Sequence, residues 1–277
     1  MPELPEVETI RRGIDPYVVG RNLNTITSLS AGLRYPFDIK ALKKLQGQSV
    51  IATTRRSKHL LLHFNNHVMV LHFGMSGLLR LVTSKQACQP MKHDHLIFAF
   101  DQGIYLFLND VRRFGYCQII DQIQQAACLK HIGPEPLTQA FNPTYFYLKL
   151  SQSKRMIKTI LLDGHIVAGI GNIYANEALF LSKIHPHHRG QDITMPQVEQ
   201  LVTNIQMVLQ QAIDIGGTTL KDFANPTGKP GYFSQQLFVY GRDNQPCYHC
   251  QTLIQKIKTG QRTSYICPTC QPSILTE

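Results

Sequence analysis

The chain has 277 residues, enough for two domains that each bury a core of their own. It carries 28 lysines and arginines against 18 acidic residues, which gives a formal net charge of +10. A positive excess spread through folded sequence suits a polyanionic partner, most simply nucleic acid, although a merely basic protein is the plain alternative. No apolar run reaches the length of a membrane span, and the acidic N-terminus lacks the order of a signal peptide. We therefore expect no membrane association.

The first residues place a proline beside a carboxylate, in the order Met1-Pro2-Glu3-Leu4-Pro5. Removal of Met1 would leave Pro2 as a terminal secondary amine, and free α-amines have a pKa of about 8, so part of the amine is neutral near pH 7. Such an amine can attack a sugar carbon and form a positively charged iminium, which acts as an electron sink. On residue type alone, helix capping is the better explanation, because proline and acidic residues are common in a first helical turn.

A short helix over residues 5–14 is followed by a series of strands. Apolar residues recur at helical spacing in the first segment, namely Leu4, Val7, Ile10 and Ile14. Short apolar or alternating runs separated by turn-forming residues predict strands over residues 49–54, 59–64, 68–73, 77–82, 95–100, 104–108 and 115–120. Short strands in such a series are typical of an antiparallel β-sandwich or barrel.

The second half of the chain changes to a helical pattern. Glycine and proline are dense between residues 133 and 143, which predicts a linker. Helical spacing then predicts helices over residues 145–150, 156–162, 173–182 and 196–215. Residues 216–233 are again rich in glycine and proline and predict a mobile loop, with a disordered connector as the alternative.

The most specific single motif consists of four cysteines near the C-terminus. Their spacing is Cys247-x2-Cys250-x16-Cys267-x2-Cys270, which matches a zinc site with four thiolate ligands. Four protein ligands leave no open position for water, so this single Zn²⁺ would be structural and not catalytic. Unpaired thiols or disulfides are the alternative. Cysteines clustered in this way favour a reducing compartment, and we expect a cytoplasmic protein.

Between the two cysteine pairs, residues 253–257 and 262–266 predict two strands joined by a tight turn at 258–261. The turn and its neighbours are basic, with Lys256, Lys258 and Arg262. Because these cations cluster on and beside the turn, we expect a zinc-anchored hairpin that projects them toward a phosphate backbone.

Three motifs together carry a family resemblance. They are the N-terminal segment 2–9 (PELPEVET), the segment 169–174 (GIGNIY) and the four-cysteine pattern. In this combination and order, the chain from residue 2 to about residue 271 resembles bacterial formamidopyrimidine-DNA glycosylases. The resemblance implies an α+β protein, with an N-terminal antiparallel β-sandwich and a terminal helix. A helical helix–two-turn–helix domain and a four-cysteine zinc ribbon follow, and duplex DNA lies between the lobes.

The domain boundaries that we expect from this pattern are a catalytic sandwich at 1–133, a linker at 134–150, a DNA-binding domain with a lid loop at 151–238, and the ribbon at 239–277. The implied activity is that of a base excision repair enzyme with two functions. It would remove 8-oxoguanine and formamidopyrimidines from damaged double-stranded DNA through a Schiff base on the N-terminal proline. It would then cleave the strand by β- and δ-elimination.

The resemblance assigns four catalytic residues. Pro2 is similar to the family nucleophile that attacks the sugar C1′, and Glu3 to the acid that assists ring opening and proton transfer. Lys58 resembles a lysine that donates a proton during β-elimination, although a surface lysine at the start of a strand is the plain interpretation. Arg262 resembles an arginine that grips phosphates and assists δ-elimination. Because arginine stays charged, we expect it to stabilise charge instead of donating a proton.

An enzyme that reacts at C1′ must take the damaged nucleotide out of the duplex and fill the gap. By resemblance, Met75, Arg112 and Phe114 enter this gap, with Arg112 facing the orphaned cytosine. The residue types fit, because arginine reads base edges and phenylalanine wedges a base step. Taken alone, a core methionine and phenylalanine beside a surface arginine would be the simpler interpretation.

Further DNA contacts are implied at Asn172 and Tyr174, which start a helix whose free amide groups attract phosphates. We expect Asn172 to be the helix cap. His93 resembles a DNA-contacting histidine. A metal site there is disfavoured. Successive side chains of a strand point to opposite faces, so among the neighbouring residues only His95 would share a face with His93. Lys154 falls near a family lysine that contacts the backbone, although the alignment can slide by one residue.

Two other functions stay open from the sequence. One is the related endonuclease of the same fold that prefers oxidised pyrimidines. The other is a non-catalytic zinc-dependent DNA-binding protein, which needs no reactive terminus. In each case DNA is the partner. We expect no protein partner, a monomer, and a bacterial cytoplasmic location on the nucleoid.

Overall fold

The computed structural model describes residues 2–83, 89–121, 126–216 and 237–273. They form two compact units. The first comprises the described residues up to Lys130 together with Ile215 and Gly216, and the second comprises His131–Asp214 together with the described residues from Leu237 onward. None of the helices described is both long and apolar enough to cross a membrane.

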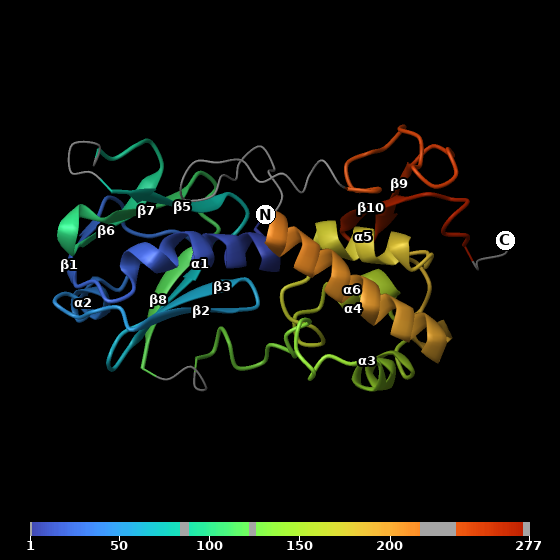
Figure 1. Cartoon of the computed structure of the whole chain (residues 1–277), viewed down its shortest axis with the longest axis horizontal. Coiled ribbons are helices and arrows are strands. Elements are labelled where there is room, and N and C mark those ends of the chain that lie inside the picture. The colour runs from blue at the N-terminus through green and yellow to red at the C-terminus, as the bar shows by residue number, and fades with distance from the viewer. Residues whose placement is uncertain (1, 84–88, 122–125, 217–236, 274–277) are drawn as a thin grey trace. The chain divides into compact units, whose positions relative to one another are not determined.

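The first unit begins with helix α1 (Leu4–Val18), which continues past the predicted end at Ile14. Pro16 lies inside its last turn and removes one backbone donor there. Val18 is nevertheless fully buried, so packing of the last turn against the core offsets the lost hydrogen bond. Figure 1 shows α1 running along the sandwich beside β2 and β3.

Two antiparallel four-stranded sheets make up the body of the first unit. One has the order β1-β6-β7-β5, with strands Leu23–Ser28, Asp94–Phe100, Tyr105–Asp110 and Gly77–Val82. The other has the order β2-β3-β4-β8, with strands Ala52–Arg56, His59–His63, Val68–His72 and Tyr116–Ile120. Buried leucine, valine, isoleucine and phenylalanine side chains from α1 and from both sheets form one apolar core. The predicted antiparallel sandwich with a terminal helix is confirmed.

Strand β1 and the short helix α2 (Ile39–Lys43) were not predicted. In β1 only Leu23 is fully buried, so the strand lacks the apolar alternation by which strands are recognised. It forms by pairing with β6 at the sheet edge, in a register that sets Ile26 opposite Phe98. Backbone pairing, and not local sequence pattern, therefore determines this strand.

The second unit is built from helices and a C-terminal ribbon. Its helices are α3 (Pro143–Leu150), α4 (Ile157–Leu161), α5 (Asn172–Leu181) and α6 (Met195–Ile215). Helix α3 thus occupies part of the segment expected to be a linker. Helix α6 buries one apolar stripe, whereas α5 is buried on nearly every side and packs against α4 and the ribbon strand β10. Because α5 is packed in this way, the positions of its first residues are fixed.

The ribbon is a two-stranded hairpin of β9 (Gln255–Thr259) and β10 (Arg262–Ile266). Strand β9 begins two residues later than predicted, and Lys258 belongs to the strand and not to the turn. The turn contains only Gly260 and Gln261, and Gly260 adopts a positive φ of 58°. A tight turn of two residues requires a positive φ, which glycine adopts without strain. The strands therefore remain paired up to the turn.

Candidate active site and nucleic-acid interface

The N-terminal pair Pro2 and Glu3 lies at the start of α1. Both residues are buried, and Glu3 is the N-cap residue with 2% of its surface exposed. The Glu6 carboxylate accepts a hydrogen bond of 2.9 Å from the Glu3 backbone N–H, so the segment that carries residue 2 is held in place. The positive end of a helix favours a carboxylate there and disfavours a protonated amine. The local field therefore disfavours the protonated form of a terminal amine at residue 2.

The next glutamate along α1, Glu8, has a different environment. Its carboxylate contacts three guanidinium groups, those of Arg11 at 2.8 Å, Arg12 at 2.9 Å and Arg55 at 3.5 Å. Burial raises the pKa of Glu8, but hydrogen bonds and charge from these arginines outweigh it and lower the pKa overall. Glu8 thus anchors α1 to β2 as a fixed anion, which leaves Glu3 as the acid next to residue 2.

Lys58 lies in the two-residue turn between β2 and β3 and is half-buried. Its neighbour Ser57 has a φ of 56°, and the Ser57 carbonyl accepts a hydrogen bond of 2.9 Å from the Arg55 guanidinium. The lysine is thus presented by a constrained turn directly before β3. Strain of this type is held by the surrounding contacts.

Behind this turn lies a buried aromatic cluster of His59, His72 and Tyr116. The His59 Nδ1 atom lies 3.2 Å from the Arg56 carbonyl oxygen, which can only accept, so Nδ1 carries the proton. The Tyr116 hydroxyl therefore donates to His59 Nε2, at 2.7 Å. Burial, followed by the charges of His59, Lys58 and Arg34, lowers the pKa of His72 to about 3. His72 is therefore neutral at physiological pH, and the charge of Lys58 contributes to its lowered pKa.

Two loops bring together the residues expected to enter the DNA gap. A Cβ atom at Gly74 would lie 2.5 Å from the backbone of Phe114, so the loop that carries Met75 and the loop that carries Phe114 touch. The fully buried Asp110 joins them, because it accepts hydrogen bonds from the Ser76 hydroxyl at 2.6 Å and from the Gly115 N–H at 2.8 Å. The two loops behave as one rigid rim.

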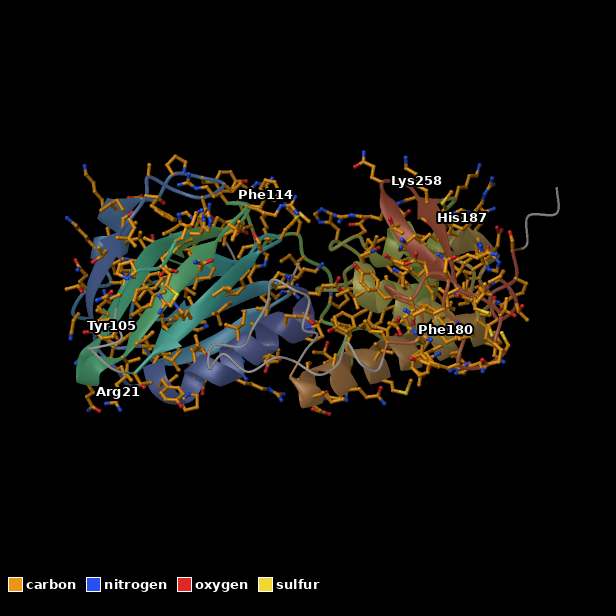
Figure 2. All side chains as sticks on the ribbon, turned by 90° about the horizontal axis from the view of Figure 1, so that it is seen from above. Arg21, Tyr105, Phe114, Phe180, His187 and Lys258 are labelled. Atoms are coloured by element: carbon orange, nitrogen blue, oxygen red, sulfur yellow. The ribbon has the colours of Figure 1, made fainter. Side chains whose placement is uncertain are left out.

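On this rim the Arg112 guanidinium stacks over the Phe114 ring, 4.9 Å from its centroid. Phe114 is 46% exposed and projects from the loop that follows β7, as Figure 2 shows. Met75 is half-buried at the base of the same rim. The structure therefore brings Met75, Arg112 and Phe114 together, and an exposed aromatic ring at a loop tip is not the core residue of the simpler interpretation.

His93 and His95 have different roles. His93 precedes β6 with a φ of 71° and is half-buried, so the expected strand alternation does not apply to it. Its carbonyl accepts a hydrogen bond of 3.1 Å from the Asp110 N–H, which places it beside the loop rim. His95 is buried and donates from Nε2 to the Asp110 carbonyl at 3.0 Å. His95 is therefore structural, and His93 is the more exposed of the two.

In the second unit, Asn172 is the first residue of α5, and Gly171 is the N-cap. The prediction that Asn172 caps the helix is wrong. Its side-chain amide instead donates to the Thr263 carbonyl on β10 at 3.1 Å, which ties the helix start to the ribbon. Tyr174 is only 1% exposed and packs in the core of this unit. Of the two predicted contacts here, Asn172 is the more accessible.

The ribbon places its cations on different faces. Because Arg262 pairs with Thr259, these two side chains share one face, whereas Lys258 pairs with Thr263 on the other. Lys256 is on the Lys258 face and forms an ion pair of 2.8 Å with Asp243. The expected cluster of three cations is therefore wrong: strand alternation separates Arg262 from the two lysines. The Arg262 side chain is exposed at the turn.

The basic residues near the start of α4 are distinguished by burial. Lys154 is exposed, and Arg155 forms an ion pair of 2.8 Å with Asp163. Lys158 is fully buried, and its ammonium donates to the Thr263 carbonyl and to the Ser264 hydroxyl, both at 2.7 Å. Of these three residues, Lys154 is thus the one that is exposed and forms no ion pair among the described residues. Sequence alone did not indicate Lys158, because a lysine buried against hydroxyl and carbonyl oxygens has no local signature.

The four cysteines form the metal centre that their spacing predicts. Their sulfur atoms all lie within 4.8 Å of one another, with 3.3 Å between Cys250 and Cys267 and 4.0 Å between Cys247 and Cys270. Four sulfurs bound to one tetrahedral zinc lie about 3.8 Å apart, so the donor set fits Zn²⁺. Backbone N–H groups of His249 and Cys270 donate to two of the sulfurs at 3.4 Å, which favours thiolates. One structural zinc is the cofactor that this centre holds.

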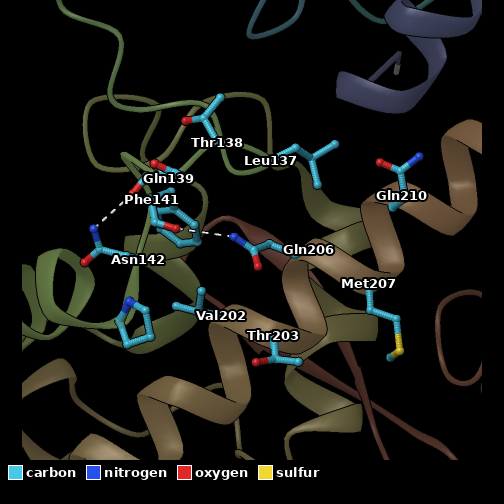
Figure 3. A pocket seen from close by; sticks show the side chains of 11 residues that line it. Leu137, Thr138, Gln139, Phe141, Asn142, Val202, Thr203, Gln206, Met207 and Gln210 are labelled. Carbon is cyan, nitrogen blue, oxygen red and sulfur yellow. Dashed lines mark hydrogen bonds between the residues drawn. The ribbon is translucent and has the colours of Figure 1, made fainter.

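The described residues also line an open groove of about 760 Å³ in the second unit, between residues 137–143 and α6 (Figure 3). Its lining consists mainly of amide, hydroxyl and apolar groups, and the Gln206 amide donates to the Pro136 carbonyl at 3.0 Å. None of the predicted site residues lines it. The groove is therefore separate from the candidate site, and the expected lid at 216–233 lies almost entirely outside the described residues.

Family models match the chain in three consecutive segments. The formamidopyrimidine-DNA glycosylase N-terminal domain matches residues 1–117, and the formamidopyrimidine-DNA glycosylase H2TH domain matches residues 132–224. A zinc finger found in FPG and IleRS matches residues 244–272. The order of the three agrees with the sandwich, the helical unit and the ribbon of the structure.

Relatives match over the whole length. A formamidopyrimidine-DNA glycosylase of Hydrogenovibrio crunogenus is 46% identical over 275 residues, which is 99% of this chain and 98% of that protein. Another, of Hahella chejuensis, is 44% identical over 98% of this chain and 100% of its own length. The chain belongs to the formamidopyrimidine-DNA glycosylase family. This confirms the resemblance seen in the sequence.

Solved structures of formamidopyrimidine-DNA glycosylases have the same fold. The Lactococcus lactis protein in complex with DNA that contains an abasic site has a TM-score of 0.90 and 34% identity, and covers 98% of this chain and 100% of its own. The same protein with DNA that contains an oxidised pyrimidine has a TM-score of 0.90 and 35% identity. Formamidopyrimidine-DNA glycosylases are repair enzymes with a zinc finger, and damaged DNA is the ligand in these relatives.

Proposed function

We propose that this chain is a bifunctional DNA glycosylase and abasic-site lyase of base excision repair, which removes oxidised purines from duplex DNA. The observation that carries the proposal is the buried Pro2-Glu3 pair at the start of α1, in a chain of this family. Once Met1 is removed, Pro2 is a secondary amine held by its helix start beside a carboxylate. A non-catalytic DNA-binding protein has no need of this arrangement.

The first step follows from amine chemistry. The neutral Pro2 nitrogen attacks C1′ of the damaged nucleotide, the bond from C1′ to the base breaks, and the base leaves with a proton. Opening of the sugar ring, with a proton delivered to the ring oxygen, leaves a cationic iminium between Pro2 and C1′. Glu3 is the group that handles this proton, because its carboxylate is adjacent to the amine and buried.

The iminium then drives strand cleavage. It makes the C2′ proton acidic, so loss of that proton breaks the C3′–O bond and releases the 3′ phosphate as the leaving group, which is the β-elimination. The new double bond extends the conjugation and acidifies the C4′ proton. Loss of this proton breaks the C5′–O bond, which is the δ-elimination, and water finally hydrolyses the iminium to free Pro2.

Lys58 and Arg262 serve these eliminations. Lys58 lies half-buried on a constrained turn, and its charge contributes to the lowered pKa of His72, so its ammonium lies close to the His59–His72–Tyr116 cluster. We assign it proton transfer in the β-elimination and contact to the damaged nucleotide. Arg262 is exposed at the ribbon turn and cannot lose its proton, so it holds a phosphate and stabilises the charge of the leaving group in the δ-elimination.

DNA binding involves two further groups of residues. Met75, Arg112 and Phe114 form the rim that fills the gap left by the flipped nucleotide, with Arg112 reading the orphaned cytosine. Asn172, His93 and Lys154 contact the phosphate backbone, and Tyr174 supports Asn172 from within the core. Electrostatic attraction to DNA also places the protein on the nucleoid in the cytoplasm, where it acts as a monomer.

The oxidised-purine assignment and its alternatives are separated by one set of reactions. Purified protein is incubated with duplexes that contain 8-oxoguanine opposite cytosine, thymine glycol, or an undamaged guanine. We expect excision of 8-oxoguanine to exceed that of thymine glycol by at least about tenfold. The reverse order would assign the pyrimidine-specific endonuclease of this fold. Tight binding without release of any base would assign the non-catalytic DNA-binding protein.

A further inference from the structure

The β9–β10 hairpin carries Arg262 but does not hold the guanidinium itself. Within the described part of the chain, the Arg262 guanidinium donates no hydrogen bond and forms no ion pair. Among the described residues, its position is therefore set by the backbone of the turn and of the two strands beside it. Whatever holds this backbone sets where the charge of Arg262 lies.

The β10 edge of the hairpin is held by the helices. Lys158 and Asn172 both donate to the Thr263 carbonyl, at 2.7 Å and 3.1 Å, and the Asn176 side-chain oxygen accepts from the Tyr265 N–H at 2.9 Å. Lys158 is fully buried, so its own hydrogen bond is shielded from water. This edge of the ribbon is fixed to α4 and α5.

The β9 edge is held from the segment after α5 by a histidine. His187 Nε2 lies 3.1 Å from the Lys258 carbonyl oxygen and 3.1 Å from the Thr259 hydroxyl oxygen. A carbonyl can only accept, so Nε2 carries a proton and the ring is fixed in that tautomer or in the charged form. Figure 2 shows His187 and Lys258 side by side at the ribbon.

Thr259 transmits this contact to Arg262. The two residues pair directly across the turn, on the same face. The Thr259 side chain is 4% exposed and also hydrogen bonds to the Ser264 hydroxyl at 2.7 Å, which in turn accepts from Lys158. A continuous chain of hydrogen bonds therefore runs from His187 through Thr259 and Ser264 to Lys158, beneath the turn that presents Arg262.

We propose that His187 is a positioning residue for Arg262, and through it for the δ-elimination. The inference rests on the function proposed above, because it assumes that Arg262 stabilises the second leaving phosphate. Without the His187 contact, the β9 edge and the turn gain freedom, while the N-terminal amine, Glu3 and Lys58 of the other unit are untouched. Loss of His187 thus acts on the second elimination and not on base excision.

The test compares His187→Ala with His187→Gln, in which the side-chain amide can replace the Nε2 donor. A duplex with one 8-oxoguanine and a 5′ label gives distinguishable β- and δ-elimination products. For His187→Ala we expect the δ-elimination rate to fall about tenfold with excision kept within about twofold of the wild type. The Gln variant should regain most of the δ-elimination. Gln255→Ala is the matched control, because it changes an exposed side chain of the same strand and should leave both the excision rate and the product ratio unchanged.

A wild-type product ratio in His187→Ala would overturn the inference, as would an equal loss of excision and δ-elimination. If His187→Ala does not fold, Thr259→Val deletes only the hydroxyl link and must shift the same ratio. The proposed function fails in a different way, through absence of base release by the wild-type protein. A wild-type protein that excises the base but forms no δ product would refute the role of Arg262 and with it the inference.

Discussion

The Ser76 hydroxyl donates a hydrogen bond of 2.6 Å to the buried Asp110 carboxylate, and this contact helps to join the loop of Met75 to the loop of Arg112 and Phe114. The same hydroxyl accepts from the Arg112 N–H at 3.0 Å. Removal of any one of the donors that surround a buried carboxylate lowers the free energy of unfolding. The rim is therefore a preorganised element, and its rigidity can be tested separately from its chemistry.

Ser76→Ala should loosen the rim. Removal of the hydroxyl leaves the Asp110 carboxylate short of one donor, and we expect the free energy of unfolding of the first unit to fall by about 1–2 kcal/mol in urea titrations. Excision of 8-oxoguanine should slow more than cleavage of a preformed abasic site, because only the former requires base eversion. Ser28→Ala removes an exposed hydroxyl on β1 and serves as the control. Equal slowing of both reactions would argue against a role of the rim in eversion.

Phe114→Ala should separate DNA wedging from stability. The ring is 46% exposed, so its removal should change the free energy of unfolding by no more than about 0.5 kcal/mol. The excision rate should nevertheless fall at least about tenfold, because the ring no longer fills the base step. Val111→Ala removes an apolar side chain that is 57% exposed in the same loop, and single-turnover rates should not distinguish it from the wild type. Equal rates for the Val111 and Phe114 variants would rule out the wedge.

Zinc removal should unfold the ribbon and leave the sandwich intact. The core around the metal is small and contains Val239, Ile254 and two of the cysteines, so metal binding, worth about 10 kcal/mol or more, is its main source of stability. Atomic emission should find about one zinc per chain in the wild type and none in Cys250→Ser. The same variant should lose DNA binding. Cys128→Ser, outside the centre, should keep both. Retention of zinc in Cys250→Ser would contradict the four-thiolate centre.

His72 should make the first unit sensitive to acid. Its pKa is lowered to about 3 in the folded protein by burial and by the charges of His59, Lys58 and Arg34, whereas it is about 6.5 in an unfolded chain. The unfolded state then binds a proton first as the pH falls, so stability is lost between about pH 6.5 and pH 3. We expect about 1–2 kcal/mol less stability at pH 5 than at pH 7.

His72→Gln should be less stable at pH 7, because the ring stacks on Tyr116 and accepts a hydrogen bond from the Gly74 N–H. Its dependence on pH, however, should be flatter than that of the wild type. Urea titrations at both pH values measure this difference. An unchanged dependence would show that another group, such as His185, is responsible.

The sequence predicted the features that depend on local spacing. The helix that follows Pro2, the strand series and the four cysteines each have a characteristic residue spacing, and all three are present. Features set by long-range contacts were not predicted correctly. Asn172 binds β10 instead of capping α5, and Lys258 and Arg262 lie on opposite faces because the turn is shorter than expected. His187 had no motif, since its partners lie 71 and 72 residues away in the chain.

The central claim is covalent catalysis by the N-terminal amine of Pro2. Mature protein, shown by intact mass to lack Met1, is mixed with an 8-oxoguanine·cytosine duplex and borohydride, which reduces an iminium to a stable amine. The account predicts a covalent protein–DNA adduct that maps to residue 2, and no adduct with protein that retains Met1, because its residue 2 nitrogen is an amide. An adduct at Lys58, or tight binding with no adduct by the mature protein, would contradict it.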